Sequence, residues 1–383
     1  MIRSYRYRLQ MDNRSGAAFE AAMSVTNQIY NAALEERISA WSKAGKSITK
    51  YDQQKSLTQI RTEDPAIASY SVTMLRRPLE QVDEAFKGFF SRVRAGRTPG
   101  FPRYRNITRV RSFGFIEAVG WTLNGSCLRM KGLPQVRLKM HRPLDGRPLK
   151  LTVKRDARGR WFAIIVVKLP DVFGPTAQGA IGLDVGIENL VTDSEGRQYN
   201  RLDPDRRNST RRSRVERNLA RQRRGSKRRK KTQRRLSALR QREADARRTR
   251  HFQVASAILR AGPQIIVVEK LRIANMTRSA KGTLTEPGTN VSAKSGLNRS
   301  ILDSGLAQFI QILTDKAESA GRLVVAVDPK GTSQECSGCG AVVQKSLAQR
   351  RHRCACGLDL HRDHNAARNV LRRGVVVPGR QVA

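Results

Sequence analysis

Aromatic residues and long apolar runs are both scarce in this chain of 383 residues. Aromatic side chains make up 5% of it, too few for a surface built broadly on stacking with single-stranded nucleic acid. No stretch approaches the roughly 18 to 20 apolar residues that cross a membrane, and the first residues lack the apolar core of a secretory signal. We therefore expect a cytoplasmic protein with no membrane partner.

Acidic residues are few as well: 32 Asp and Glu stand against 74 Lys and Arg, which gives a net charge of +42. A compact protein with so much like charge repels itself unless a polyanion neutralises it, so nucleic acid is the expected partner. Ribosomal proteins, DNA-binding regulators and membrane-surface proteins share such charge, so it indicates a partner and no chemistry.

Cysteine is rare, and four of the five cysteines fall between positions 336 and 356. Their two pairs are separated by 14 residues, a spacing that lets four thiolates close tetrahedrally on one structural Zn²⁺: Cys336, Cys339, Cys354 and Cys356. The second pair is one residue tighter than the usual Cys-x-x-Cys, so His352 or His361 in place of one thiolate stays open. Free thiols in a basic loop are the simpler alternative. Cys127 stands apart and is expected to be a buried small hydrophobe.

The first half of the chain changes from a strand pattern to a helix pattern and back. Residues 1–12 alternate apolar and basic side chains, residues 13–95 carry apolar side chains at helical spacing, and residues 96–176 hold short alternating runs between glycine and proline turns. Because the first strand would otherwise have no neighbour, we expect a small β-barrel from residues 1–12 and 96–176, with the helical region 13–95 inserted in it.

The second half has the order of an RNase H fold. Short strands over 180–185, 189–192 and 197–202 are followed by helical stretches, a strand over 265–268, a helix from about 301 to 319 and a strand over 323–327. A helix over 365–373 would close this order. We therefore predict an α+β multidomain protein, in which a RuvC/RNase H-like α/β nuclease domain spans residues 177–330 and 360–383 and a zinc ribbon at 331–359 is inserted in it.

A strongly basic segment lies inside the predicted nuclease domain. Residues 206–250 contain 21 Lys or Arg and three acids, with sparse apolar positions around a break at Gly225. Two solvated helices or a disordered basic tract would explain this composition. We expect instead a basic helical hairpin over 206–260 that lies against a nucleic-acid backbone, because the chain must return to the sheet.

Three acids stand at informative places in this order. Asp184 interrupts the otherwise apolar strand over 180–185 and has a glycine two positions away on either side, Glu269 stands at the C-terminal end of the strand over 265–268, and Asp363 precedes the last helix. Each alone is explained by a strand-end turn or a helix cap. In the RNase H order, however, the three converge at one end of the sheet, where a cage of carboxylate oxygens suits two Mg²⁺ or Mn²⁺ ions about 4 Å apart. The predicted reaction is hydrolysis of a phosphodiester.

Candidate contacts to nucleic acid come from the first strand, from basic residues beside the few aromatic ones and from the basic segment. They are Arg6, Arg8, Arg103, Tyr104, Arg105, Arg223, Arg224, Lys227 and Arg228. Phe101 is a further candidate, for which a place in the core is the alternative.

Motifs along the whole chain resemble those of the TnpB proteins of insertion sequences. The run Asp-Pro-Lys-Gly-Thr-Ser-Gln-Glu-Cys-Ser-Gly-Cys-Gly at 328–340, Cys-Ala-Cys-Gly at 354–357 and Arg-Asp-His-Asn-Ala-Ala-Arg-Asn at 362–369 are similar to the C-terminal signature of that family. Further similar motifs occur in the expected order at 30–37, 100–105, 182–186 and 297–301.

The resemblance implies an RNA-guided DNA endonuclease. Its guide RNA would come from the transposon end, and it would recognise a short DNA motif beside its target and cut both strands of double-stranded DNA with one RuvC site. Asp184, Glu269 and Asp363 fall at the family's catalytic acids. The resemblance also implies that the barrel is a wedge-like domain and that the helical region is a recognition domain. One protein would bind one RNA, and the protein would associate with the prokaryotic nucleoid. His361 departs from the family, because an acid is common there.

Three other functions are open to a chain of this pattern. A compact type V CRISPR effector would share the domain plan and differ in its guide RNA. A nuclease-inactive RNA-guided DNA-binding repressor is disfavoured by the presence of all three acids. A transposase that joins strands through a phosphotyrosine is disfavoured because no His-hydrophobic-His motif is paired with a helical tyrosine. The guide sequence, the readers of the DNA motif, the cleavage pattern and the oligomeric state are not evident from the sequence.

Overall fold

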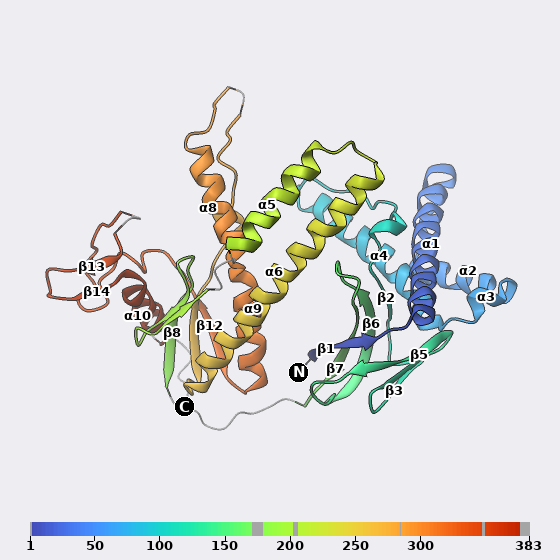
Figure 1. The fold of residues 1–383 in the computed structure, drawn as a ribbon, viewed down its shortest axis with the longest axis horizontal. Helices are drawn as coiled ribbons and strands as arrows, with labels where there is room; N and C mark the ends of the chain where they lie inside the picture. Colours follow the sequence, from blue (N-terminus) through green and yellow to red (C-terminus); the bar gives the residue numbers. More distant parts are fainter. Residues whose placement is uncertain (1, 171–178, 202–205, 284, 347–348, 376–383) are drawn as a thin grey trace. The chain divides into compact units, whose positions relative to one another are not determined.

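The chain falls into two compact units that divide near residue 171 (Figure 1). The computed structural model describes residues 2–170, 179–201, 206–283, 285–346 and 349–375. Both units contain helices and strands, which confirms the mixed α+β class. The domain boundary predicted at 176/177 and the tail from 376 lie outside the described residues. None of the described helices combines the length and the apolar character that a membrane span needs.

The first unit is built on one antiparallel sheet of seven strands in the order β2-β6-β7-β1-β5-β4-β3. The strands are β1 (Ile2–Gln10), β2 (Ser112–Phe115), β3 (Trp121–Asn124), β4 (Cys127–Met130), β5 (Leu133–Lys139), β6 (Arg147–Arg155) and β7 (Trp161–Lys168). The N-terminal strand β1 lies in the interior of the sheet, between β5 and β7. Among the described residues the pairing ends at β2 on one side and β3 on the other, in the part of the chain where a small β-barrel was predicted.

Four helices come between β1 and β2 in the chain: α1 (Asn13–Ala44), α2 (Lys50–Glu63), α3 (Pro65–Ala68) and α4 (Val72–Arg94). The Asp12 side chain caps α1 by accepting a hydrogen bond from the amide of Ser15, and Gly45 ends the helix with φ 62°. Phe19 of α1 is buried edge-on against the rings of Phe113 and Trp161. The helices therefore share one core with the sheet.

The second unit contains a five-stranded sheet in the order β10-β9-β8-β11-β12. Its strands are β8 (Ala180–Asp184), β9 (Asn189–Asp193), β10 (Gln198–Asn200), β11 (Ile265–Glu269) and β12 (Leu323–Val327). β8, β11 and β12 are parallel, and β9 and β10 run antiparallel to their neighbours. These strands and the helices between them have the order that the sequence predicts.

Helices cover both faces of this sheet. The helices of the unit are α5 (Arg206–Arg221), α6 (Lys227–Arg260), α7 (Ile273–Met276), α8 (Val291–Ser304), α9 (Leu306–Ser319) and α10 (Arg362–Val375). On one face, Ile266 and Val268 pack in a core with side chains of α6 and α9. On the other, Val267 packs against Val370 of α10. Because side chains of a strand alternate between faces, positions 267 and 269 of β11 share the α10 face.

One predicted helix of this unit has a different form in the structure, whereas the basic segment forms a helical hairpin as expected. The helix predicted from about 301 to 319 is two helices, α8 and α9, because Gly305 between them has φ 64° and breaks the helical hydrogen bonding. The basic segment folds as two helices, α5 and α6, around a turn in which Gly225 has φ 85°. Val215 of α5 is buried against Leu236 and Leu239 of α6, which holds this pair together.

Candidate functional site

Asp184 and Glu269 end two neighbouring parallel strands. Leu183 of β8 lies opposite Val268 of β11, so the next residue of each strand reaches the same edge of the sheet. By the alternation of side chains both carboxylates lie on the face that α10 covers. Asp363 stands in the first turn of α10, and its charge acts on both of the other carboxylates. The structure thus brings the three predicted acids together.

Glycines let α10 approach the sheet at this place. A Cβ atom at Gly182 of β8 would lie 2.2 Å from the carbonyl oxygen of Ala367 in α10. At the other end of the helix, a Cβ at Gly374 would lie 2.3 Å from the side chain of Val267. At Gly182 the backbones of strand and helix are therefore in contact, and a larger residue there would have to displace α10 from β8.

The surroundings of Asp184 and Glu269 raise the pKa values of both carboxyl groups. Burial raises the pKa of Asp184 well above its usual range, the charges of Glu269 and Asp363 raise it further, and Arg362 acts against them. Burial also raises the pKa of Glu269, while a hydrogen bond from Thr332 and the charge of Arg373 lower it. Bringing a cation between the carboxylates would relieve this repulsion.

The donor set at the acids fits a hard divalent cation. All three side chains offer carboxylate oxygens, which Mg²⁺ and Mn²⁺ prefer, and the raised pKa values of Asp184 and Glu269 indicate that these two carboxylates gain from a nearby positive charge. A cavity of about 820 Å³ opens beside Glu269 and is lined by residues of both signs, including Lys270, Arg272, Lys330 and Asp328. Its cations suit the approach of a phosphate.

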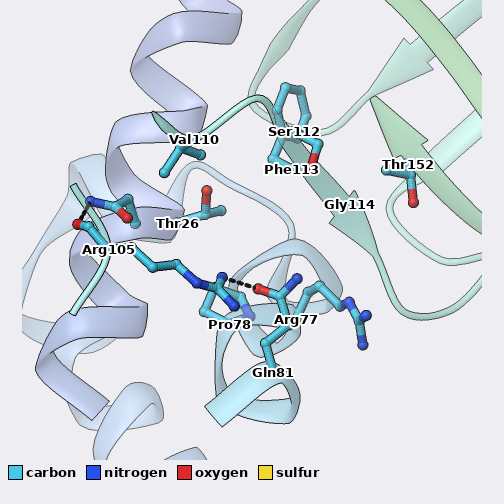
Figure 2. Close-up of a pocket in the computed structure, with 11 residues that line it drawn as sticks. Thr26, Arg77, Pro78, Gln81, Arg105, Val110, Ser112, Phe113, Gly114 and Thr152 are labelled. Atoms are coloured by element: carbon cyan, nitrogen blue, oxygen red, sulfur yellow. Dashed lines mark hydrogen bonds between the residues drawn. The ribbon is translucent and has the colours of Figure 1, made fainter. Parts of the chain in front are cut away.

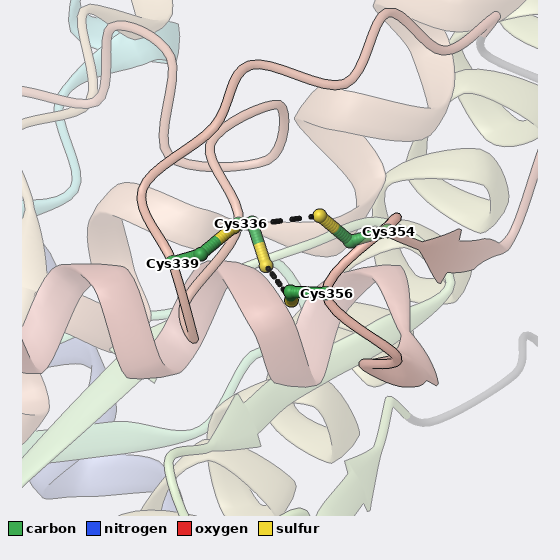
Figure 3. A group of neighbouring side chains, drawn as sticks. All are labelled: Cys336, Cys339, Cys354 and Cys356. Carbon is green, nitrogen blue, oxygen red and sulfur yellow. Dashed lines mark hydrogen bonds between the residues drawn. The ribbon is translucent and has the colours of Figure 1, made fainter.

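Four cysteine thiols form a second cluster, in the segment before α10 (Figure 3). Their Sγ atoms all lie within 4.8 Å of one another, with 3.6 Å between Cys336 and Cys356 and 3.5 Å between Cys339 and Cys354. A tetrahedron of sulfurs about 2.3 Å from a zinc ion has edges of about 3.8 Å, so the cluster has the size of a four-cysteine zinc site. A strand pair, β13 (Arg351–Arg353) and β14 (Asp359–His361), borders it.

The thiol pKa values also fit a cation. Burial works to raise the pKa of Cys336, but hydrogen bonds from the Cys339 amide and from His352 overcome it and hold this pKa at about 5. At Cys354 the amide of Cys356 works to lower the pKa, but hydrogen bonds with neighbouring thiols and burial raise it to about 12. Four thiols so close together disfavour a second thiolate unless a positive ion lies among them.

Neither of the two histidines that could have replaced a thiolate belongs to the cluster. His352 is fully buried beside the cluster, where it lowers the pKa of the Cys336 thiol, and its Nδ1 contacts Lys345. His361 faces the acids: its Nδ1 accepts a hydrogen bond from the Asp363 amide (3.3 Å) and lies 3.8 Å from the Asp363 carboxylate. The cluster itself consists of the four cysteines.

Arg105, one of the predicted nucleic-acid contacts, is used inside the first unit (Figure 2). Its guanidinium stacks 3.5 Å from the ring centroid of Tyr30, and Nη1 donates to Gln81 (2.7 Å). Its amide and carbonyl bind Asn31 (2.8 Å and 3.0 Å). Arg105 therefore holds α1, α4 and the following loop together beside a small cavity of about 250 Å³.

The other predicted contacts are more open to solvent. Arg103 and Tyr104 are exposed, and the Tyr104 hydroxyl donates to Glu35. Arg8 is exposed on β1, whereas the Arg6 guanidinium lies 3.7 Å above the ring of Phe162. In the second unit, exposed cations gather at the α5–α6 turn: Arg223, Arg224, Lys227 and Arg228.

Several polar residues around the acids were quoted in motifs but given no role by the sequence. Thr332 donates to Glu269, and the buried carboxamides of Asn365 and Asn369 bind the backbone that precedes and enters the first cysteine pair. The spacing of four between the two asparagines places them on one face of α10, which is the signal that could have found them. The target of Thr332 lies 63 positions away and has no such signal.

Family models match three parts of the chain. Residues 1–46 match a helix-turn-helix domain of IS605-type proteins, residues 165–280 match a model described as "Probable transposase" of the same type, and residues 307–370 match a "Cas12f1-like, TNB domain". Of solved structures, the Cas12f1–sgRNA–target DNA complex gives a TM-score of 0.59 over 94% of this chain and 83% of that one, at 14% identity, which shows a common fold.

Relatives of known name match most of the chain. It is 32% identical over 307 residues to the protein named "Putative RNA-guided DNA endonuclease InsQ" of Escherichia coli (strain K12), covering 79% of this chain and 74% of that protein. It is 28% identical over 380 residues to a "Putative RNA-guided DNA endonuclease" of Streptomyces pristinaespiralis, covering 97% of this chain and 89% of that protein. Fold and site define a protein with a carboxylate cluster at a sheet edge and a four-cysteine segment before its last helix. The chain belongs to the TnpB family, as its motifs predict.

Proposed function

We propose that this protein is the RNA-guided DNA endonuclease of an insertion sequence, and that Asp184, Glu269 and Asp363 form its one cutting site in a RuvC/RNase H-like domain. The observation that carries the proposal is the meeting of these carboxylates where β8, β11 and α10 come together. The names of relatives that match most of the chain support RNA guidance and a DNA substrate.

At this site the residues of the chain would hold the metal ions and orient the substrate. The three carboxylates would hold two divalent cations, and the contact between Gly182 and α10 fixes the distance between the strand acids and Asp363. Lys270, Arg272 and Lys330 line the cavity beside Glu269 and would attract the phosphates of the substrate there. The chemistry that Mg²⁺ or Mn²⁺ supplies when bound is activation of water for in-line attack on phosphorus and stabilisation of the departing 3′ oxygen.

The remaining parts of the chain are proposed to bind nucleic acid. A zinc ribbon over 331–359, closed by the four cysteines, would hold the arginines of β13 close to the duplex. The exposed cations at the α5–α6 turn would contact phosphates. The sheet of the first unit would act as the wedge and its helices as the recognition part, where a short motif beside the target is read. One protein would bind one guide RNA from the transposon end, at the nucleoid.

A compact type V CRISPR effector is the second candidate, and a specific likeness favours it. A segment of 57 residues is 46% identical to the CRISPR-associated endodeoxyribonuclease Cas12f1 of Sulfoacidibacillus thermotolerans. Sequencing the RNA that co-purifies with the protein separates the two. We expect RNA from a transposon end; spacer and repeat sequence of a CRISPR array would overturn this origin, and absence of bound RNA would overturn RNA guidance.

A further inference from the structure

Thr332 and Glu269 are joined inside the second unit. Thr332 is only 3% exposed, and its hydroxyl lies 2.7 Å from Oε1 of Glu269 and 3.0 Å from the carbonyl oxygen of Pro329. The hydroxyl has one hydrogen to donate. The carboxylate is both the nearer and the charged acceptor, so it receives this hydrogen.

Thr332 is itself held by the last helix. The side-chain amide of Asn369, a fully buried residue of α10, donates to the carbonyl oxygens of Thr332 (2.8 Å) and Glu335 (2.7 Å). One turn earlier, Asn365 donates to the same Glu335 carbonyl (2.7 Å) and accepts a hydrogen bond from the Ser337 amide (2.8 Å).

Arg373, on the same side of α10, is a third residue that binds the segment around Thr332. Its guanidinium donates to the carbonyl oxygens of Asp328 (2.9 Å) and Lys330 (2.7 Å) and to the Glu335 carboxylate (2.7 Å). Thr332 therefore has a fixed backbone on both sides. The helix that fixes it is the one that carries Asp363 in its first turn.

We propose that Thr332 is a positioning residue for the cutting site: its hydroxyl fixes the carboxylate of Glu269 in the orientation that a divalent cation needs. The inference rests on the proposed function, because it concerns the same carboxylates. Without the hydroxyl, Glu269 would lose this hydrogen bond and could rotate away from Asp184 and Asp363. Loss of such a partner of a metal ligand typically weakens metal binding about 10- to 100-fold.

The test compares Thr332→Val, which keeps the shape and removes the donor, with Thr332→Ser, which restores it. Thr62→Val is the matched control, because Thr62 is an exposed helix residue whose hydroxyl binds only its own helix, at Thr58. Mn²⁺ binding to the full-length, zinc-loaded protein freed of RNA is measured by the loss of the free-ion EPR signal, with Asp184→Ala as the background.

We expect Thr332→Val to weaken Mn²⁺ binding at least about tenfold, while Thr332→Ser and Thr62→Val stay within about twofold of the unmodified protein. Mn²⁺ binding by Thr332→Val as tight as that of the unmodified protein would overturn the inference, as would an equal loss in Thr332→Ser. Loss of zinc from Thr332→Val would also overturn it, because the hydroxyl would then serve the fold of the cysteine segment.

A cleavage assay separates this inference from the proposed function. The Mg²⁺ concentration for half-maximal cleavage should rise about tenfold in Thr332→Val, with the rate restored at high Mg²⁺. An unmodified protein that does not cut at any Mg²⁺ concentration would contradict the proposed function and leave the Mn²⁺ comparison intact. An unmodified protein that cuts, beside a Thr332→Val variant with the same Mg²⁺ requirement, would overturn the role of Thr332 alone.

Discussion

Gly182 lies so close to Ala367 that a Cβ atom on the glycine would be 2.2 Å from the alanine's carbonyl oxygen. This contact joins the strand that ends in Asp184 to the helix that begins beside Asp363. The distance between two of the proposed metal ligands therefore depends on a residue that has no side chain.

Replacing Gly182 by alanine should push α10 away from the sheet. We expect a loss of stability of about 1–3 kcal/mol, as in overpacked cores, and a cleavage rate about 100-fold lower, because small misplacements of reacting groups are costly. Gly16→Ala is the control, since nothing lies within 4 Å of a Cβ there. Urea unfolding and single-turnover cleavage measure the two effects; full activity in Gly182→Ala would contradict the proposed role of this contact.

The cysteine cluster should contain one zinc ion per chain. Cys336→Ser removes the most buried of the four thiols, and we expect zinc measured by plasma mass spectrometry to fall to background. Cys127→Ser is the matched control, because this cysteine lies in the first unit on β4. An equal zinc content in both variants would argue against the cluster as the zinc site.

Stability should fall at mildly acidic pH because of His251. Burial lowers its pKa to about 4, its hydrogen bond with the Ser304 carbonyl works to raise it, and Arg247 lowers it. In the unfolded chain histidine titrates near 6.5, so between about pH 6.5 and pH 4 the unfolded state binds the extra proton. The free energy of unfolding should therefore decrease as pH falls through this window, by up to about 3 kcal/mol.

His251→Gln tests this assignment, because glutamine can still donate to the Ser304 carbonyl and does not titrate. Urea unfolding at pH 7 and at pH 4.5 should show a smaller loss of stability in the variant than in the unmodified protein. A pH dependence that is identical in the two proteins would show that other groups cause the acid sensitivity.

The positions of Asp184 and Glu269 could be predicted because they depend on local sequence patterns. Asp184 and Glu269 end apolar runs, and parallel strands bring their ends to one edge. The break at Gly305 was missed because apolar spacing continues across it. Long-range polar contacts are invisible to such patterns: the guanidinium of Arg105 stacks on Tyr30, and the hydroxyl of Thr332 reaches Glu269.

Metal-dependent cutting by the three acids is tested most directly with Asp184→Ala. The purified protein with its RNA is given a plasmid that matches the guide, in Mg²⁺ and in EDTA, and both target binding and cleavage are measured. We predict that the unmodified protein cuts in Mg²⁺ only, and that Asp184→Ala binds the target equally well without cutting it. Cleavage by Asp184→Ala, or cleavage in EDTA, would contradict the account.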